Sequence, residues 1–132
     1  MAIPEVTLGE VMSAPVLTIE VGESLWDAWQ MLLVSGLRHI AVIDADGAFV
    51  GILSDRMILA NAPLNTDSLS ARTVGELLST ILSVRLTPEA SPIEAARLMS
   101  ERSLEAIAVL DSRHKLVGVV TETDLVRWLL AA

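Results

Sequence analysis

The sequence predicts an α/β (α+β) fold in which two β-α-β-β-α repeats pack about a pseudo-twofold axis. Three observations support this prediction. Residues 67 positions apart match along much of the 132-residue chain. In both copies an apolar, β-branched run with one glycine ends at a hydroxyl residue, which is typical of a strand that turns directly into a helix. Two repeats are too few for a solenoid, which needs about three, so they are expected to pack against each other.

The internal duplication is visible in identical residues at equivalent strand and helix positions. The identical pairs are Ser24/Ser91, Ala28/Ala95, Leu37/Leu104, Ile40/Ile107, Ala41/Ala108, Val42/Val109, Asp44/Asp111, Val50/Val117 and Gly51/Gly118. Substitutions such as Ile52/Val119 and Ser54/Thr121 keep the size or the chemistry of the side chain. Chance similarity does not explain matches that follow the expected elements so closely.

The first repeat is predicted over residues 8–62. Its elements, in order, are a helical turn at 9–13 ended by Pro15, a strand at 16–19, a helix from the N-cap Ser24 to about Ser35, a strand at 39–43, a hairpin turn at 44–47, a return strand at 48–53 and a helix from Ser54 to about Asn61. Gly36 is placed to end the first long helix, because glycine adopts the left-handed conformation at helix C-termini. The Asp44–Gly47 turn is typical of a hairpin.

Residues 63–72 are polar and lack strong periodicity, so they are predicted to form a linker. The second repeat follows over residues 73–130 with the same order of elements. Its lead-in, Gly75–Ser79, resembles Gly9–Ser13 at an offset of 66.

Composition excludes several classes of function. The net charge is −8, from 17 acidic and 9 basic residues, and no basic stripe is visible, so nucleic acid is not an expected partner. The absence of cysteine excludes disulfides and thiolate zinc sites. No apolar run reaches the roughly 18 residues of a membrane span, and the first residues lack the pattern of a secretory signal, so none is expected. We therefore expect a cytoplasmic protein that does not bind membranes.

The segment Val117–Asp124 carries the main candidate site, with Thr121 and Asp124 at the start of a helix. A carboxylate can accept hydrogen bonds from two vicinal hydroxyls, and a helix N-terminus offers N–H groups to a phosphate. The same spacing is also close to a capping box, in which the two side chains satisfy the backbone of their own helix. Both interpretations can hold together. In the first repeat the position of Asp124 is taken by Met57, which has no carboxylate.

The repeat resembles the cystathionine-β-synthase (CBS) domain, and the two copies resemble a tandem CBS pair, or Bateman module, over residues 8–130. The matching motifs are Val11-Met12-Ser13 with Leu77-Leu78-Ser79, the Leu-x-x-Ile-Ala-Val-x-Asp strands at 37–44 and 104–111, Gly51-Ile52-Leu53-Ser54, and Gly118-Val119-Val120-Thr121-x-x-Asp124. This resemblance implies a regulatory module that binds AMP, ADP, ATP or S-adenosylmethionine in the cleft between the repeats. It implies no required cofactor.

The resemblance also implies which residues bind the ligand. In the main site Asp124 would hold the ribose hydroxyls and Thr121 the ribose or phosphate, completed by Ser83, Val84, Ile107 and Ala108. The first site is expected to be weaker, because of Met57, and would use Thr18, Ile40, Ser54 and Arg56. Arg38 and His39 are either phosphate contacts or an exposed pair at a strand end.

Other functions receive less support. No nucleophile elbow, phosphate loop or paired-carboxylate constellation is present, so an enzyme is not expected. The two histidines, His39 and His114, lie in separate turns and predict no metal site. The helices that contain Trp26, Trp29 and Trp128 are apolar on more than one face, which predicts a homodimer or, alternatively, helices enclosed within one core. A purely structural dimerisation module with vestigial ligand clefts is the alternative function.

Overall fold

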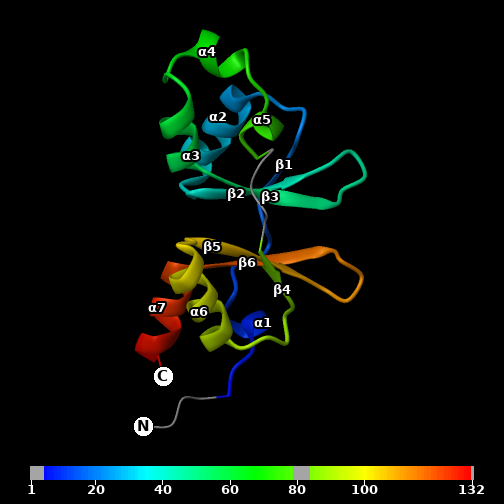
Figure 1. Cartoon of the computed structure of the whole chain (residues 1–132), viewed down its shortest axis with the longest axis vertical. Helices are drawn as coiled ribbons and strands as arrows, with labels where there is room; N and C mark the ends of the chain where they lie inside the picture. The colour runs from blue at the N-terminus through cyan, green and yellow to red at the C-terminus, as the bar shows by residue number, and fades with distance from the viewer. Residues whose placement is uncertain (1–4, 79–83, 132) are drawn as a thin grey trace. The chain divides into compact units, whose positions relative to one another are not determined.

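The computed structural model describes residues 5–78 and 84–131 (Figure 1). The chain forms two compact units. The first unit is Leu17–Ser83. The second unit joins Met1–Val16 to Val84–Ala132.

The first unit contains a three-stranded sheet in the order β1-β2-β3. Its strands are β1 (Thr18–Glu20), β2 (His39–Ile43) and β3 (Phe49–Ser54), with β1 parallel and β3 antiparallel to β2. Its helices are α2 (Leu25–Ser35), α3 (Asp55–Asn61), α4 (Thr66–Ser70) and α5 (Val74–Leu78). Helices α2, α3 and α5 lie on one face of the sheet, and α4 packs against α2 (Figure 1).

The second unit repeats this arrangement. Its sheet has the order β4-β5-β6, from β4 (Arg85–Leu86), β5 (Ala106–Leu110) and β6 (Leu116–Thr121). Its helices are α1 (Leu8–Val11), α6 (Pro92–Arg102) and α7 (Glu122–Ala131), which pack against the strands (Figure 1). The predicted α/β class with two copies of β-α-β-β-α is confirmed.

Each unit has its own apolar core. In the first unit α2 buries Leu25, Ala28 and Leu32 against the strands, and these positions are spaced as one face of a helix requires. In the second unit Ala95 and Met99 of α6 take the equivalent place. The middle residues of β2 and β5 are buried throughout, which explains why both read as continuous apolar runs.

The predicted helix starts are confirmed by side-chain caps. The hydroxyl oxygens of Ser24, Ser54 and Ser91 each accept a hydrogen bond of 3.1 Å from the backbone N–H three residues later. These bonds satisfy donors that a helix N-terminus otherwise leaves unpaired. Helix α2 ends at Gly36 with φ of 72°, as predicted.

The compact units do not coincide with the sequence repeats, because the lead-in segments are exchanged. Leu8 of α1 has no exposed surface and belongs to the core of the second unit, where its N–H donates to Ala90 O at 2.8 Å. Its counterpart in the second repeat, Val74 of α5, is buried in the core of the first unit and donates to Glu23 O at 2.9 Å. Each repeat therefore supplies one short helix to the unit built mainly from the other.

The predicted linker at residues 63–72 is not an unstructured connection, because it contains α4. Asn65 Oδ1 accepts a hydrogen bond of 2.8 Å from Ser68 N–H, and Leu69 is buried in the core of the first unit. A helix of five residues is too short to show helical periodicity in the sequence. Strand β1 also begins two residues later than predicted, at Thr18.

Candidate functional site

The turn from β6 to α7 brings Thr121 and Asp124 together in the second unit. Thr121 is the last residue of β6, and Asp124 lies in the first turn of α7. The β-branched run Val117, Val119 and Val120 favours the strand. Gly118 within this run has a specific reason to be glycine, because a Cβ atom there would collide with the side chain of Met12.

Asp124 is 5% exposed, and its carboxylate is bonded to three protein donors. Oδ2 accepts hydrogen bonds from Thr121 N–H at 2.9 Å and from Thr121 Oγ1 at 3.0 Å. Oδ1 accepts one from the hydroxyl of Ser13 at 2.9 Å. In return Asp124 N–H donates to Thr121 Oγ1 at 3.2 Å.

These bonds form the reciprocal pattern of a capping box. The capping interpretation of Thr121 and Asp124 is therefore confirmed. The assignment of the same carboxylate to ligand hydroxyls stays a prediction.

One cation lies near this carboxylate. Arg127 Nη1 is 3.9 Å from Asp124 Oδ1, one helical turn along α7, and its side chain is largely exposed.

Ser13 is a member of this cluster that the sequence pattern does not identify. It lies directly after α1, and its backbone pairs with Val119 of β6 in both directions, at 2.9 and 3.1 Å. The sequence marks Ser13 only as part of the motif Val11-Met12-Ser13 and through its counterpart in the second repeat, Ser79. That similarity marks an equivalent position but gives no indication that Ser13 contacts a residue 111 positions away.

The remaining residues predicted for the main site lie on neighbouring strands of the same unit. Ile107 and Ala108 are in the middle of β5, and neither side chain has exposed surface. Val84 is half-buried just before β4, whereas Ser83 lies outside the described residues. The apolar side chains of Ile107 and Ala108 belong to the interior, so their part in a ligand site stays a prediction.

The residues predicted for the first site gather partly at the start of α3. Ser54 caps α3, and His39 is its partner in the β2–β3 register. Arg38 Nε is 3.5 Å from Asp55 Oδ2, an exposed ion pair. Thr18 is exposed on β1, whereas Ile40 is fully buried.

Arg56 and Met57 occupy the first turn of α3. Arg56 is exposed, and Met57 packs against the core of the first unit. The position equivalent to Asp124 therefore carries no carboxylate, and the acidic residue of this turn, Asp55, pairs with Arg38.

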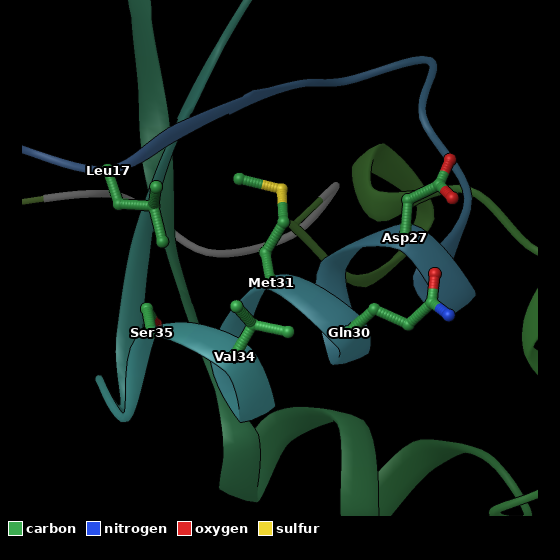
Figure 2. A pocket seen from close by; sticks show the side chains of 6 residues that line it. All are labelled: Leu17, Asp27, Gln30, Met31, Val34 and Ser35. Atoms are coloured by element: carbon green, nitrogen blue, oxygen red, sulfur yellow. The ribbon is translucent and has the colours of Figure 1, made fainter.

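A surface hollow of about 400 Å3 lies elsewhere in the first unit (Figure 2). Figure 2 shows Asp27 and Gln30 at one end and Leu17 and Ser35 at the other. The hollow is on the side of α2 away from its core residues and includes none of the predicted ligand residues. Its lining residues are Leu17, Asp27, Gln30, Met31, Val34 and Ser35.

Two further findings apply to the described residues only. Within 5–78 and 84–131, no group of three or more histidine, aspartate and glutamate side chains is placed to hold a metal ion. In the same ranges, no helix has both the length and the apolar character needed to cross a membrane.

Comparison with known proteins gives a consistent family match. The CBS domain family matches residues 8–63 and again residues 74–131. A CBS domain-containing protein of Dictyostelium discoideum is 30% identical over 134 residues, covering 96% of this chain and 92% of that protein. A homoserine O-acetyltransferase of Methanococcoides burtonii is 26% identical over 121 residues, but the chain spans only about a quarter of its length.

Solved structures show the same fold. The crystal structure of CBSX2 in complex with AMP matches with a TM-score of 0.80 and 27% identity. The match covers 96% of this chain and 97% of that one.

Proposed function

Because the chain belongs to the CBS domain family, we propose that it is a regulatory module that binds an adenosine-containing ligand at the β6–α7 turn. The ligand would be AMP, ADP, ATP or S-adenosylmethionine. The observation that carries the proposal is the pair of Thr121 and Asp124 at the start of α7, which places a buried carboxylate beside a helix N-terminus.

The chemistry of this turn suits a nucleoside. One carboxylate can accept hydrogen bonds from the two vicinal hydroxyls of a ribose. The positive end of the α7 helix dipole and the exposed Arg127 would favour a phosphate. The AMP complex of CBSX2, a similar protein, supports this class of ligand.

The equivalent position in the first repeat is proposed to bind more weakly. Met57 takes the place of the carboxylate, so a ribose there would lose its anionic acceptor. Ser54, with Arg56, Arg38 and His39 nearby, would leave a site for phosphate but not for the diol. We therefore propose one strong site per chain.

Regulation would follow from the ligand's preference for one arrangement of repeats or protomers, because a ligand shifts an equilibrium only by its difference in affinity. No catalytic step is proposed. The module would report ligand concentration to a partner that acts on that signal.

A ligand screen tests this function. Thermal unfolding would be followed with AMP, ATP and S-adenosylmethionine, for the wild type and Asp124→Asn. A true ligand at 100 times its Kd should stabilise the wild type by about 2.7 kcal/mol. Asp124→Asn nearly preserves shape, and Ser91→Ala serves as a matched control that removes a cap in the same unit without touching the site. No stabilisation of the wild type by any of the three, or equal stabilisation of Asp124→Asn, would contradict the proposal.

A structural dimerisation module is the second candidate. It is favoured by apolar side chains on the outer faces of α2 and α7, among them Val34 at 90% and Leu130 at 83% exposure. Exposed apolar surface of this kind is typical of an interface, and a second copy of the chain is the proposed occupant. Light scattering on the wild type, Val34→Lys and Leu130→Lys tests this. A dimer that becomes monomeric in either variant, with no response to any ligand, would favour the structural function.

A further inference from the structure

The carboxylate of Asp124 has almost no free acceptor capacity. A carboxylate offers about four lone-pair sites. Three are taken by Thr121 N–H, Thr121 Oγ1–H and Ser13 Oγ–H, at 2.9, 3.0 and 2.9 Å. Arg127, at 3.9 Å, is beyond hydrogen-bond distance. One site remains, on Oδ1.

A vicinal diol needs two such sites. If both hydroxyls of a ribose donate to Asp124, one of the protein donors must leave. This requirement follows from counting donors and acceptors and does not depend on where the base or phosphate of the ligand lies.

Ser13 is the donor that can leave at the lowest cost. Ser13 is exposed, so its hydroxyl can bond to water once it releases Asp124. Thr121 is half-buried, so water has less access to its N–H, and Thr121 Oγ1 is also the acceptor for Asp124 N–H. Releasing a buried donor without a new partner costs more than exchanging one that water can reach.

We infer that Ser13 is a specificity-determining residue of the ligand site, because its hydroxyl occupies the position on Asp124 Oδ1 that a second ligand hydroxyl requires. The inference rests on the proposed function. The hydroxyl of Ser13 should therefore lower the affinity of the site for ligands with a vicinal diol. It should not change the affinity for ligands that offer Asp124 a single hydroxyl.

The test uses AMP and 2′-deoxyadenosine 5′-monophosphate, which differ in one hydroxyl. Both would be titrated calorimetrically into the full chain as wild type, Ser13→Ala and Ser91→Ala. Ser13→Ala should bind AMP about fivefold more tightly, the effect of one hydrogen bond of typical net strength. Its affinity for the deoxynucleotide should stay the same. Ser91→Ala, which loses a cap in the same unit, should match the wild type with both ligands.

The outcomes separate this inference from the proposed function. Suppose that the wild type binds AMP but Ser13→Ala binds AMP no more tightly, or that its affinity for both nucleotides rises equally. The inference is then wrong and the proposed function stands. If no variant binds AMP, both are wrong. If only Ser13→Ala binds AMP, the wild type fails the proposed function, whereas the competition between Ser13 and a ligand hydroxyl is supported. Hydrogen exchange at the Ser13 and Val119 amides, which should stay protected in Ser13→Ala, shows that the segment remains docked.

Discussion

Asp124 and Met57 occupy the same position in the two repeats, and their side chains do different things. Asp124 caps α7 and holds Ser13, whereas Met57 packs its thioether against the core of the first unit. Both helices begin with a hydroxyl cap, Thr121 or Ser54, which accepts a hydrogen bond from the N–H three residues later. The two repeats therefore differ in the acceptor they offer, not in the turn that would present it.

Met57→Asp should restore a second site. The new carboxylate would lie beside Ser54 as Asp124 lies beside Thr121, so the number of AMP molecules bound per chain should rise from one to two. Met57→Asn is the matched control, because asparagine is similar in size to aspartate but lacks its negative charge. Calorimetric titration measures the stoichiometry. A folded Met57→Asp variant that still binds one AMP would show that the carboxylate is not the missing element.

Two left-handed backbone positions also differ between the repeats. The first repeat places Gly36 after α2 and Gly47 in its hairpin, with φ of 72° and 84°. At the equivalent positions the second repeat has Ser103 and His114, with φ of 53° and 62°. A side chain in this region of backbone space is strained, whereas glycine is not.

Ser103→Gly should therefore stabilise the protein by up to about 1 kcal/mol, and Gly36→Ala should destabilise it by about 1 kcal/mol. No atom lies within 4 Å of a Cβ added at Gly36, so its cost comes from the backbone alone. Urea denaturation curves give both differences. An unchanged free energy of unfolding in Gly36→Ala would contradict the left-handed conformation of Gly36.

At the scale of elements, the exchange of lead-in helices links each repeat to the other unit. Leu8 of α1 belongs to the second unit, and Val74 of α5 belongs to the first. Both side chains have no exposed surface. A substitution at Leu8 should therefore destabilise the second unit, although Leu8 belongs to the first repeat. A substitution at Val74 should destabilise the first unit.

Leu8→Ala should destabilise by about 2–5 kcal/mol, the usual cost of a buried leucine truncated to alanine. Hydrogen exchange should show faster opening at β5 and β6, with β2 and β3 less affected. Val74→Ala is the reciprocal control and should give the opposite pattern. Faster exchange of β2 and β3 in Leu8→Ala would contradict the exchange of helices.

The β5–β6 hairpin contains a carboxylate whose ionisation contributes to its stability. Asp111 Oδ1 accepts hydrogen bonds from Lys115 N–H at 3.0 Å and from Arg113 N–H at 2.8 Å. The bond from Lys115, followed by that from Arg113 and the charges of both side chains, lowers the pKa of Asp111 below its ordinary value. A lowered pKa means that the ionised form stabilises the folded hairpin.

That contribution should be fully present above the pKa of an aspartate in the unfolded chain, about 3.9, and lost as the pH falls through the lower folded pKa. Titration of the Asp111 carboxyl by nuclear magnetic resonance measures the folded pKa directly. Asp111→Asn should make the turn amides insensitive to pH over this range. A midpoint at or above the ordinary value would contradict the hydrogen-bonded geometry.

Much of the element order could be predicted from the sequence, because its signals are local. Ser24 and Gly36 mark the two ends of α2 by the chemistry of caps, and the apolar runs at 39–43 and 106–110 mark buried strands. Helix α4 was missed because five residues carry too little periodicity, although Asn65 is a typical cap. The exchange of α1 and α5 depends on which core accepts Leu8, a choice that no local pattern encodes.

The candidate site was predictable in part for the same reason. Thr121 and Asp124 are three residues apart, so their proximity follows from the helix start alone. Ser13 and Asp124 come together only when the chain folds, and the periodicity of a sequence does not predict contacts between such distant residues. The burial of Ile107 likewise depends on the packing of α6 and α7 over its face of the sheet, which its apolar character alone does not specify.

At the scale of the whole molecule, a duplicated fold carries two unequal turns. The family match covers both repeats, so the difference between them is a property of individual side chains and not of architecture. A chain with this construction should respond to ligand through one repeat while the other keeps the fold. The exposed apolar side chains of α2 and α7 form the surface through which the proposed dimer would transmit that response.

The most direct measurement is a calorimetric titration of AMP into the wild type and Asp124→Asn. We expect one AMP per chain for the wild type, and for Asp124→Asn a loss of affinity of at least tenfold, equivalent to about 1.4 kcal/mol. Two equal sites in the wild type, or an unchanged affinity in Asp124→Asn, would contradict the assignment of Asp124 as the residue that defines the site.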